Sequence, residues 1–192
     1  MKNISKFLYE IGLLKHVKRS GWWLAGIRDP ESVAEHSHRA AAIAYLLAVM
    51  EKADPERAAC IALFHDIHEA RVSDLHKVGQ RYVEWSDVEE LAIADQLSGL
   101  PRAMAGRLQG LKSAFQQKKS KEAVIARDAD YLECLVQACE YRAQGNTSVE
   151  DWITNCRKRL ATKSARRLGD ECVRTDPQLW WEGLKKKIVA GK

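Results

Sequence analysis

Histidine and aspartate stand side by side at His65 and Asp66, in an otherwise apolar stretch that ends at Glu69. Such a pair is costly to bury in an apolar helix unless a partner or a metal ion compensates it. Imidazole and carboxylate groups are ligands of divalent metal ions, and a bound ion can activate water for attack on a substrate. The pair therefore points to a metal-dependent hydrolytic centre, provided that other segments supply further ligands.

A second histidine falls on the buried face of the helix expected before it. At 100° per residue, His36 shares an arc with apolar residues from Val33 to Leu47, whereas His38 lies nearly opposite. In the next expected helix, His65 and Glu69 are four positions apart and share a face. A lone inward histidine is more often a core residue, but the nested pattern of histidines and carboxylates favours a ligand role for His36.

One more oxygen ligand is expected from residues 126–133, which contain Asp128 and Asp130. The apolar face of this segment includes Ile125, Ala129 and Leu132, and Asp128 lies closer to it than Asp130 does. Periodicity alone favours Asp128. A central helix can be buried on several sides, however, so both aspartates remain candidates on these grounds.

The elements that must position these residues are all predicted to be helices. Asp29-Pro30, Asp54-Pro55 and Asp176-Pro177 each offer a capping carboxylate before a proline, and Ser86 to Glu89 fits a capping box. Few segments alternate apolar and polar residues as strands do. The expected helices cover residues 3–16, 31–51, 55–67, 86–98, 102–117, 120–144, 148–161, 163–174 and 177–189. The 192 residues are therefore expected to form a single all-α domain, spanning residues 1–192.

Composition excludes several classes of protein. The N-terminus carries charges within its apolar pattern and does not resemble a signal peptide, and the longest apolar stretch, Ala40–Met50, is too short to span a bilayer. The five cysteines are odd in number and form no Cys-x-x-Cys pair, which indicates free thiols in a reducing compartment. We expect a cytoplasmic protein with no membrane partner.

The positive charge is concentrated near the C-terminus. Residues 155–192 contain eleven Lys or Arg and four Asp or Glu, a surplus larger than the net charge of +5 for the whole chain. Such a region can bind nucleic acid. Its charges alternate with apolar residues such as Leu160 and Leu168, however, which favours helices with one solvated face that pack on the domain.

The nested residues resemble a known signature. His36, then His65-Asp66, then an aspartate in the context Ala-Asp-Tyr-Leu resemble the H…HD…D pattern of HD-domain metal phosphohydrolases. More narrowly, the stretch Glu31-Ser-Val-Ala-Glu-His36-Ser and the spacing of Glu69 and Asp74 after His65 resemble the HD-domain 5′-deoxynucleotidases, as does Arg19-Ser-Gly-Trp22 upstream. The similarity covers residues 14–146.

This resemblance implies a fold, a ligand set and an activity. It implies an HD-domain helical bundle in which one divalent ion (Mn²⁺, Co²⁺, Fe²⁺ or Mg²⁺) is bound by His36, His65, Asp66 and Asp130, with Asp128 as the alternative to Asp130. The implied reaction is hydrolysis of (deoxy)ribonucleoside 5′-monophosphates to nucleoside and phosphate by a homodimeric enzyme.

The resemblance also implies roles for three other residues. Arg19 would bind the substrate phosphate through its planar guanidinium, although it could instead cap the preceding helix. Glu69 and Asp74 would position water or transfer a proton, and the sequence does not assign the two roles.

Other interpretations remain to be compared with the structure. Trp22 and Trp23 could be core residues or face the nucleoside, and His68 could form a rival zinc site with His65 and His76. The same metal centre could act on a cyclic or hyperphosphorylated nucleotide. A non-enzymatic, helical nucleic-acid-binding protein would leave the buried histidines and aspartates without explanation.

Overall fold

The computed structural model describes residues 1–184, and within them the chain forms α-helices and short 3-10 turns without any β-strand. The α-helices are α1 (Lys2–Gly12), α2 (Val33–Glu51), α3 (Pro55–Leu63), α4 (Glu69–Val72), α5 (Trp85–Leu97), α6 (Arg102–Gln117), α7 (Lys121–Ala143), α8 (Glu150–Arg159) and α9 (Lys163–Arg174). The prediction of an all-α fold is confirmed. In the described part of the chain, no helix is both long and apolar enough to cross a membrane.

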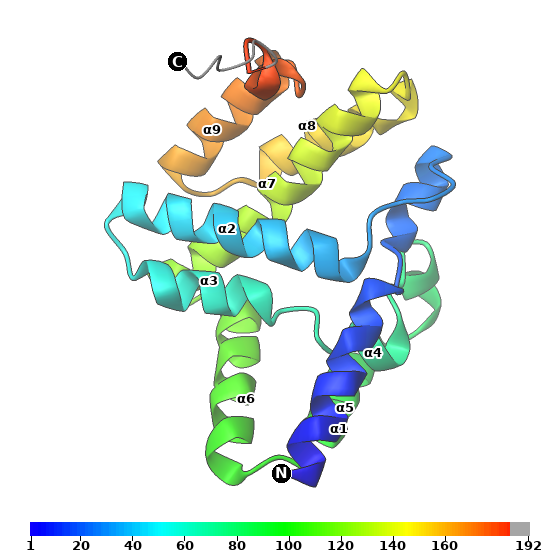
Figure 1. Cartoon of the computed structure of the whole chain (residues 1–192), viewed down its shortest axis with the longest axis vertical. Helices are drawn as coiled ribbons and strands as arrows, with labels where there is room; N and C mark the ends of the chain where they lie inside the picture. The colour runs from blue at the N-terminus through cyan, green and yellow to red at the C-terminus, as the bar shows by residue number, and fades with distance from the viewer. Residues whose placement is uncertain (185–192) are drawn as a thin grey trace, which may run out of the picture.

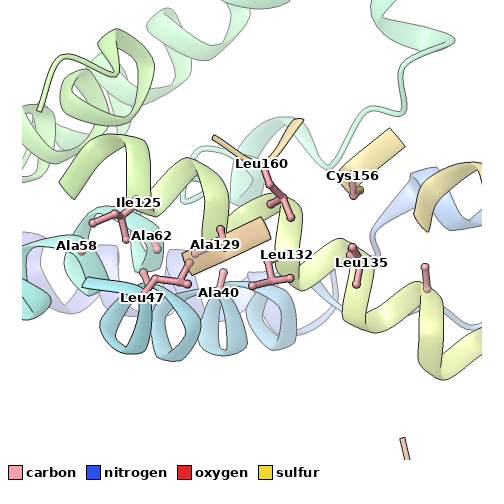
Figure 2. Close-up of a cluster of buried hydrophobic side chains, with 14 of the residues drawn as sticks. Ala40, Leu47, Ala58, Ala62, Ile125, Ala129, Leu132, Leu135, Cys156 and Leu160 are labelled. Carbon is pink, nitrogen blue, oxygen red and sulfur yellow. The ribbon is translucent and has the colours of Figure 1, made fainter. Parts of the chain in front are cut away.

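Helix α7 is the centre of the bundle. Helices α2 and α3 lie across its middle, α8 and α9 lie on one side of them, and α6 and the group of α1, α4 and α5 extend on the other (Figure 1). In Figure 2, Leu47 of α2 and Ala62 of α3 meet Ile125 and Ala129 of α7 in the main core. Alanines at these contacts let the helix backbones approach closely, and each larger apolar side chain stabilises the fold by about 1.5–3 kcal/mol when buried.

Side chains cap the starts of α2, α3, α7 and α9, and two of the predicted caps are corrected. Asp54 caps α3 as predicted, and its side chain accepts the backbone N–H of Arg57 at 2.9 Å. Helix α2 is instead capped by Ser32 and Glu35 in a reciprocal capping box, so the prediction that Asp29 would cap it was wrong. The predicted capping box at α5 was also wrong, because Glu84 is its N-cap residue and makes no side-chain cap.

The structure also corrects the helix that was expected to carry the His-Asp pair. Helix α3 ends at Leu63, and residues 64–68 form a turn before α4. His65 and Asp66 therefore lie on this turn rather than on a helix. Ile67 anchors the turn in a second apolar cluster that also contains Phe7 of α1 and Ile93 of α5.

Three other segments differ from the prediction in smaller ways. The expected helix 3–16 is divided into α1 and a 3-10 turn at Leu13–Lys15, and a 3-10 turn at Thr147–Val149 precedes α8. The expected helix 177–189 is represented in the described residues by a 3-10 turn at Leu179–Trp181, and its remainder, from residue 185, lies outside them.

Candidate metal centre and active site

Two buried histidine rings from different elements approach each other at the centre of the molecule. His36 of α2 and His65 of the 64–68 turn have ring centroids 5.4 Å apart. His36 Nε2 lies 3.4 Å from Asp130 Oδ1, and His65 Nε2 lies 2.9 Å from Asp66 Oδ2 and 3.8 Å from Asp130 Oδ1. The four side chains predicted to bind a metal are therefore brought together around one point.

The opposite ring nitrogens are held by other groups. His36 Nδ1 forms a short hydrogen bond with the Glu133 carboxylate. His65 Nδ1 lies 2.6 Å from the carbonyl oxygen of Ala62, to which it donates. Because each Nδ1 is engaged, each Nε2 faces the aspartates and would present its lone pair to an ion bound between them, which is the orientation that metal-binding histidines adopt.

The donor set fits a divalent cation. The Nε2 atoms of His36 and His65 are buried and lack a hydrogen-bond partner among the described residues. Two ligand atoms that lie about 2.1 Å from one ion are separated by about 3–4 Å, and the distances around this point fall in or close to that range. Two imidazoles with two carboxylates suit Mn²⁺, Co²⁺, Fe²⁺ or Mg²⁺ chemistry.

Asp128 and Asp130 take different positions on α7. Asp128 is buried and its two carboxylate oxygens accept the backbone N–H groups of Ala161 and Thr162, each at 2.7 Å. It therefore holds the start of α9, and both of its carboxylate oxygens are engaged there. Periodicity correctly placed Asp128 in the interior, but the geometry favours Asp130 as the fourth ligand.

Cys134 is another group close to this point, since its sulfur and ligand atoms of His36 and Asp130 lie within 4.8 Å of one another. A hydrogen bond with Cys156 and burial raise the pKa of the Cys134 thiol well above its usual value. A protonated thiol is a poor metal ligand. Cys134 instead accepts a hydrogen bond from the Arg19 guanidinium at 3.3 Å.

Without a cation, the two histidines carry charge. Burial and the nearby Arg19 lower the pKa of His36, but Glu133 and Asp130 outweigh them and raise it to about 9. Burial likewise lowers the pKa of His65, but Asp66 and Asp130 raise it to about 9. The carboxylates thus favour a positive charge between them, and a divalent ion would supply that charge in place of two protons.

Arg19 reaches the same site from the 3-10 segment Ser20–Ala25, for which it is the N-cap residue. Its Nη1 atom lies 3.4 Å from Asp66 Oδ2 and 3.5 Å from Asp74 Oδ2. The guanidinium is directed into the candidate site. The alternative in which it caps the preceding helix is not favoured by this geometry.

The two predicted catalytic carboxylates lie beside Arg19 and Asp66. Glu69 is buried at the start of α4, and burial together with the charges of Asp66 and Asp74 raises the pKa of its carboxyl group well above the usual range. Asp74 accepts the hydroxyl hydrogen of Ser20 at 3.2 Å, and burial raises its pKa while Arg19 opposes that shift. A protonated Glu69 next to an anion site can donate a proton to a leaving oxygen.

These groups open onto a cleft with a volume of about 410 Å³. The cleft is lined by all the predicted site residues except His36, which lies fully buried behind it: Arg19, His65, Asp66, Glu69, Asp74 and Asp130. Pockets of this size hold small molecules such as nucleotides. Basic side chains of Lys77, Arg127 and Arg159 also line it and could face an anionic ligand.

The two tryptophans separate into different environments. Trp22 is buried, stacks on Trp152 with ring centroids 5.7 Å apart, and donates its indole N–H to Glu31 at 3.1 Å. It is a core residue with one edge on the cleft. Trp23 is exposed.

His68 does not form the rival zinc site. His68 contacts Lys112 and Glu89, whereas His76 Nδ1 accepts the backbone N–H of Gly79. Among the described residues, no group of closely spaced ligand atoms combines His65, His68 and His76. The ammonium of Lys112, 3.4 Å from His68 Nδ1, further disfavours a cation there.

Sequence reasoning missed the carboxylate that orients His36. Glu133 is fully buried, and its other oxygen accepts Arg39 Nε at 2.9 Å. Glu133 follows Asp130 by three positions on α7 and so shares its face, which was a signal in the sequence. The sequence did not show, however, that Glu133 contacts His36 and Arg39 of α2.

Comparisons with known proteins point to the same family as the sequence resemblance does. The profile of the HD domain family matches residues 11–170. The 5′-deoxynucleotidase HDDC2 of Bos taurus is 32% identical over 141 residues, covering 73% of this chain and 68% of that protein. The protein of the same name from Dictyostelium discoideum is 30% identical over 154 residues, covering 75% and 80%.

Solved structures show the same fold. One crystal structure with 37% sequence identity covers 94% of this chain and 99% of the other, with a TM-score of 0.76. A predicted metal-dependent phosphohydrolase from Magnetospirillum magnetotacticum is 28% identical, with a TM-score of 0.67 and coverage of 90% and 92%.

Proposed function

The chain belongs to the HD-domain family, and from this we propose that it is a metal-dependent phosphomonoesterase that hydrolyses (deoxy)ribonucleoside 5′-monophosphates, with a preference for deoxyribose, to nucleoside and phosphate. The observation that carries the proposal is the convergence of two buried imidazole Nε2 atoms, Asp66 and Asp130 beside the guanidinium of Arg19. This arrangement offers one cation site and one anion site in the same cleft.

The proposed ligands are His36, His65, Asp66 and Asp130. When bound, a divalent ion supplies Lewis-acid activation of water and neutralises phosphate charge. The chain's own groups do the rest: Glu133 and the Ala62 carbonyl hold the two imidazoles so that Nε2 faces the ion. The identity of the ion is proposed only as far as Mn²⁺, Co²⁺, Fe²⁺ or Mg²⁺.

Arg19 is the proposed phosphate-binding residue. Its guanidinium can form two parallel hydrogen bonds with phosphate oxygens, and this neutralises charge that is redistributed in the transition state. Asp74 lies 3.5 Å from Arg19 and also accepts from Ser20, which supports a role in aiming the guanidinium. Glu69, with its raised pKa, is then the better candidate for the general acid that protonates the leaving 5′ oxygen.

A phosphate-release screen tests this proposal. Metal-stripped protein would be assayed with ribo- and deoxyribonucleoside 5′-monophosphates, triphosphates and cyclic nucleotides, before and after each candidate metal is added. We expect release only from monophosphates, only with metal, and faster from deoxyribonucleotides. Faster hydrolysis of a cyclic or hyperphosphorylated nucleotide would reject the substrate assignment, and salt-sensitive oligonucleotide binding without hydrolysis would favour the nucleic-acid interpretation.

We also propose a single-domain, homodimeric, cytoplasmic protein. Packing of α8 and α9 on α7 supports one domain, in which the basic helices are part of the bundle. Tyr45, Leu46, Val49 and Met50 form an exposed apolar face on α2, which supports self-association. The five cysteines are free thiols, as a reducing compartment favours.

A further inference from the structure

The turn that carries His65 and Asp66 is bound by two side chains from helices that supply no proposed metal ligand. Lys112 of α6 donates from Nζ to the carbonyl oxygen of His65 at 2.9 Å. Gln96 of α5 donates from Nε2 to the carbonyl oxygen of Ile67 at 3.1 Å. The two acceptors flank Asp66 in the sequence, so the turn is held on both sides of this proposed ligand.

Both donors are buried, each with an exposed fraction of 4%. Burying an ammonium or an amide costs free energy unless hydrogen bonds compensate it. Helix α3 ends at Leu63. Among the described residues, Lys112 is the donor found for the His65 carbonyl oxygen, whereas the Ile67 carbonyl oxygen accepts the backbone N–H of Ala70 at 3.2 Å in addition to the Gln96 amide. The side chains of Lys112 and Gln96 thus gain acceptors in the interior, and the carbonyl oxygens of the turn gain donors.

Lys112 is itself held in place by Glu89 and His68. Its Nζ atom lies 3.4 Å from Glu89 Oε1 and 3.4 Å from His68 Nδ1, and Glu89 Oε1 lies 3.0 Å from His68 Nε2. An ammonium group can only donate, so His68 Nδ1 accepts and the ring proton belongs on Nε2, which faces Glu89. This arrangement gives the buried ammonium a charge partner and fixes its direction.

We infer that Lys112 and Gln96 are positioning residues for the metal centre: they clamp the 64–68 turn so that His65 and Asp66 meet His36 and Asp130 at one point. The inference rests on the metal centre of the proposed function. Loss of a hydrogen bond behind a metal ligand typically weakens metal binding by about 10–100-fold. Loss of either hydrogen bond should therefore weaken binding of the ion, in addition to any effect on the stability of the fold.

Mn²⁺ titration of the metal-stripped, full-length protein tests the clamp. Lys112→Met and Gln96→Leu remove the two donors with little change in length or volume, and each should raise the Kd for Mn²⁺ by about tenfold or more. Lys119→Met is the matched control, because Lys119 is exposed just beyond α6, and it should leave the Kd unchanged. Gln96 does not line the cleft, so its effect cannot come from a lost substrate contact.

The outcomes separate the clamp from the proposed function. Wild-type protein that binds Mn²⁺, with unchanged Kd values in folded Lys112→Met and Gln96→Leu, would overturn the clamp alone, even if both variants melt at lower temperature. Wild-type protein that binds no divalent ion would overturn the metal centre and the clamp together. If Lys112→Met does not fold, Gln96→Leu decides, and Lys112→Arg, which keeps a donor, should recover part of the affinity.

Discussion

Asp128 and Asp130 are two positions apart on α7 but contact different groups. The Asp128 carboxylate accepts the backbone N–H groups that lead into α9, and the Asp130 carboxylate faces the two histidines. Substitutions at the two positions should therefore have different effects. Asp130→Ala should abolish metal binding and activity while the protein remains folded. Asp128→Ala should keep the metal and destabilise the protein by about 1–3 kcal/mol, since two buried N–H groups lose their acceptor. Elemental analysis and thermal melting of both variants check this, and metal loss in Asp128→Ala alone would reverse the assignment.

Glu133 should tune metal affinity through His36. Glu133→Gln keeps the size of the side chain but weakens the short bond to His36 Nδ1, so we expect metal affinity to fall by about 10–100-fold. Glu140→Gln is a suitable control, because Glu140 also binds Arg39 but does not contact His36. Equal effects of the two substitutions on a Co²⁺ or Mn²⁺ titration would assign the effect to Arg39 instead.

Glu69 and Asp74 should be needed for turnover and not for metal binding. Glu69→Gln and Asp74→Asn are each expected to retain one metal per chain and to lose about 10²-fold or more in kcat. Because burial and the charges of Asp66 and Asp74 raise the pKa of Glu69, its acid form persists to higher pH than that of an ordinary glutamate, and activity that depends on this acid form should fall as the carboxyl group loses its proton. Glu69→Gln should lack this alkaline limb. Near-wild-type rates in both variants would remove these residues from the mechanism.

Arg19 should act on the phosphate. We expect Arg19→Ala to lower kcat/KM for deoxyribonucleoside 5′-monophosphates by about 10²-fold, with metal content unchanged. Arg19→Lys should recover only part of the loss, since lysine keeps the charge but not the planar fork. The exposed Arg107 of α6 provides the control, and Arg107→Ala should be silent. Loss of metal in Arg19→Ala would indicate a structural role for its contact with Asp66.

Metal binding should strengthen with pH. His36 and His65, with pKa values of about 9 in the metal-free protein, are protonated at neutral pH and must release protons to bind an ion. Apparent affinity should therefore rise between about pH 6 and about pH 8 and level off above about pH 9. Calorimetric titration in buffers of different ionisation enthalpy would count the protons released. Affinity that is flat over this range would show that the histidines are neutral before binding.

The sequence predicted the helical fold well because its evidence is local. Asp54-Pro55 starts α3 as expected, and the apolar arc of α2 correctly turned His36 inward. The sequence did not show which of two nearby capping residues starts α2. Ser32 caps this helix instead of Asp29, because Ser32 and Glu35 each accept the other's backbone N–H through their side chains. The end of α3 was also missed, since the apolar spacing continues through residues that leave the helix.

Within the site, spacing and family resemblance together identified the residues that converge. Periodicity alone favoured Asp128, because it reports burial and not the partner that a buried carboxylate meets. Glu133, Lys112 and Gln96 were not found, because their partners are on other elements far along the chain. Such contacts depend on tertiary packing, which a single sequence does not encode in any local pattern.

The distribution of ligands from α2 to α7 has a consequence for biosynthesis. His36 and the 64–68 turn leave the ribosome well before Asp130 does, so the growing chain holds an incomplete set of ligands for much of its synthesis. Closing so long a segment around an ion carries an entropy cost that only the packed helices offset. We therefore expect an ion held by the proposed ligands to bind only after α7 has packed against α2.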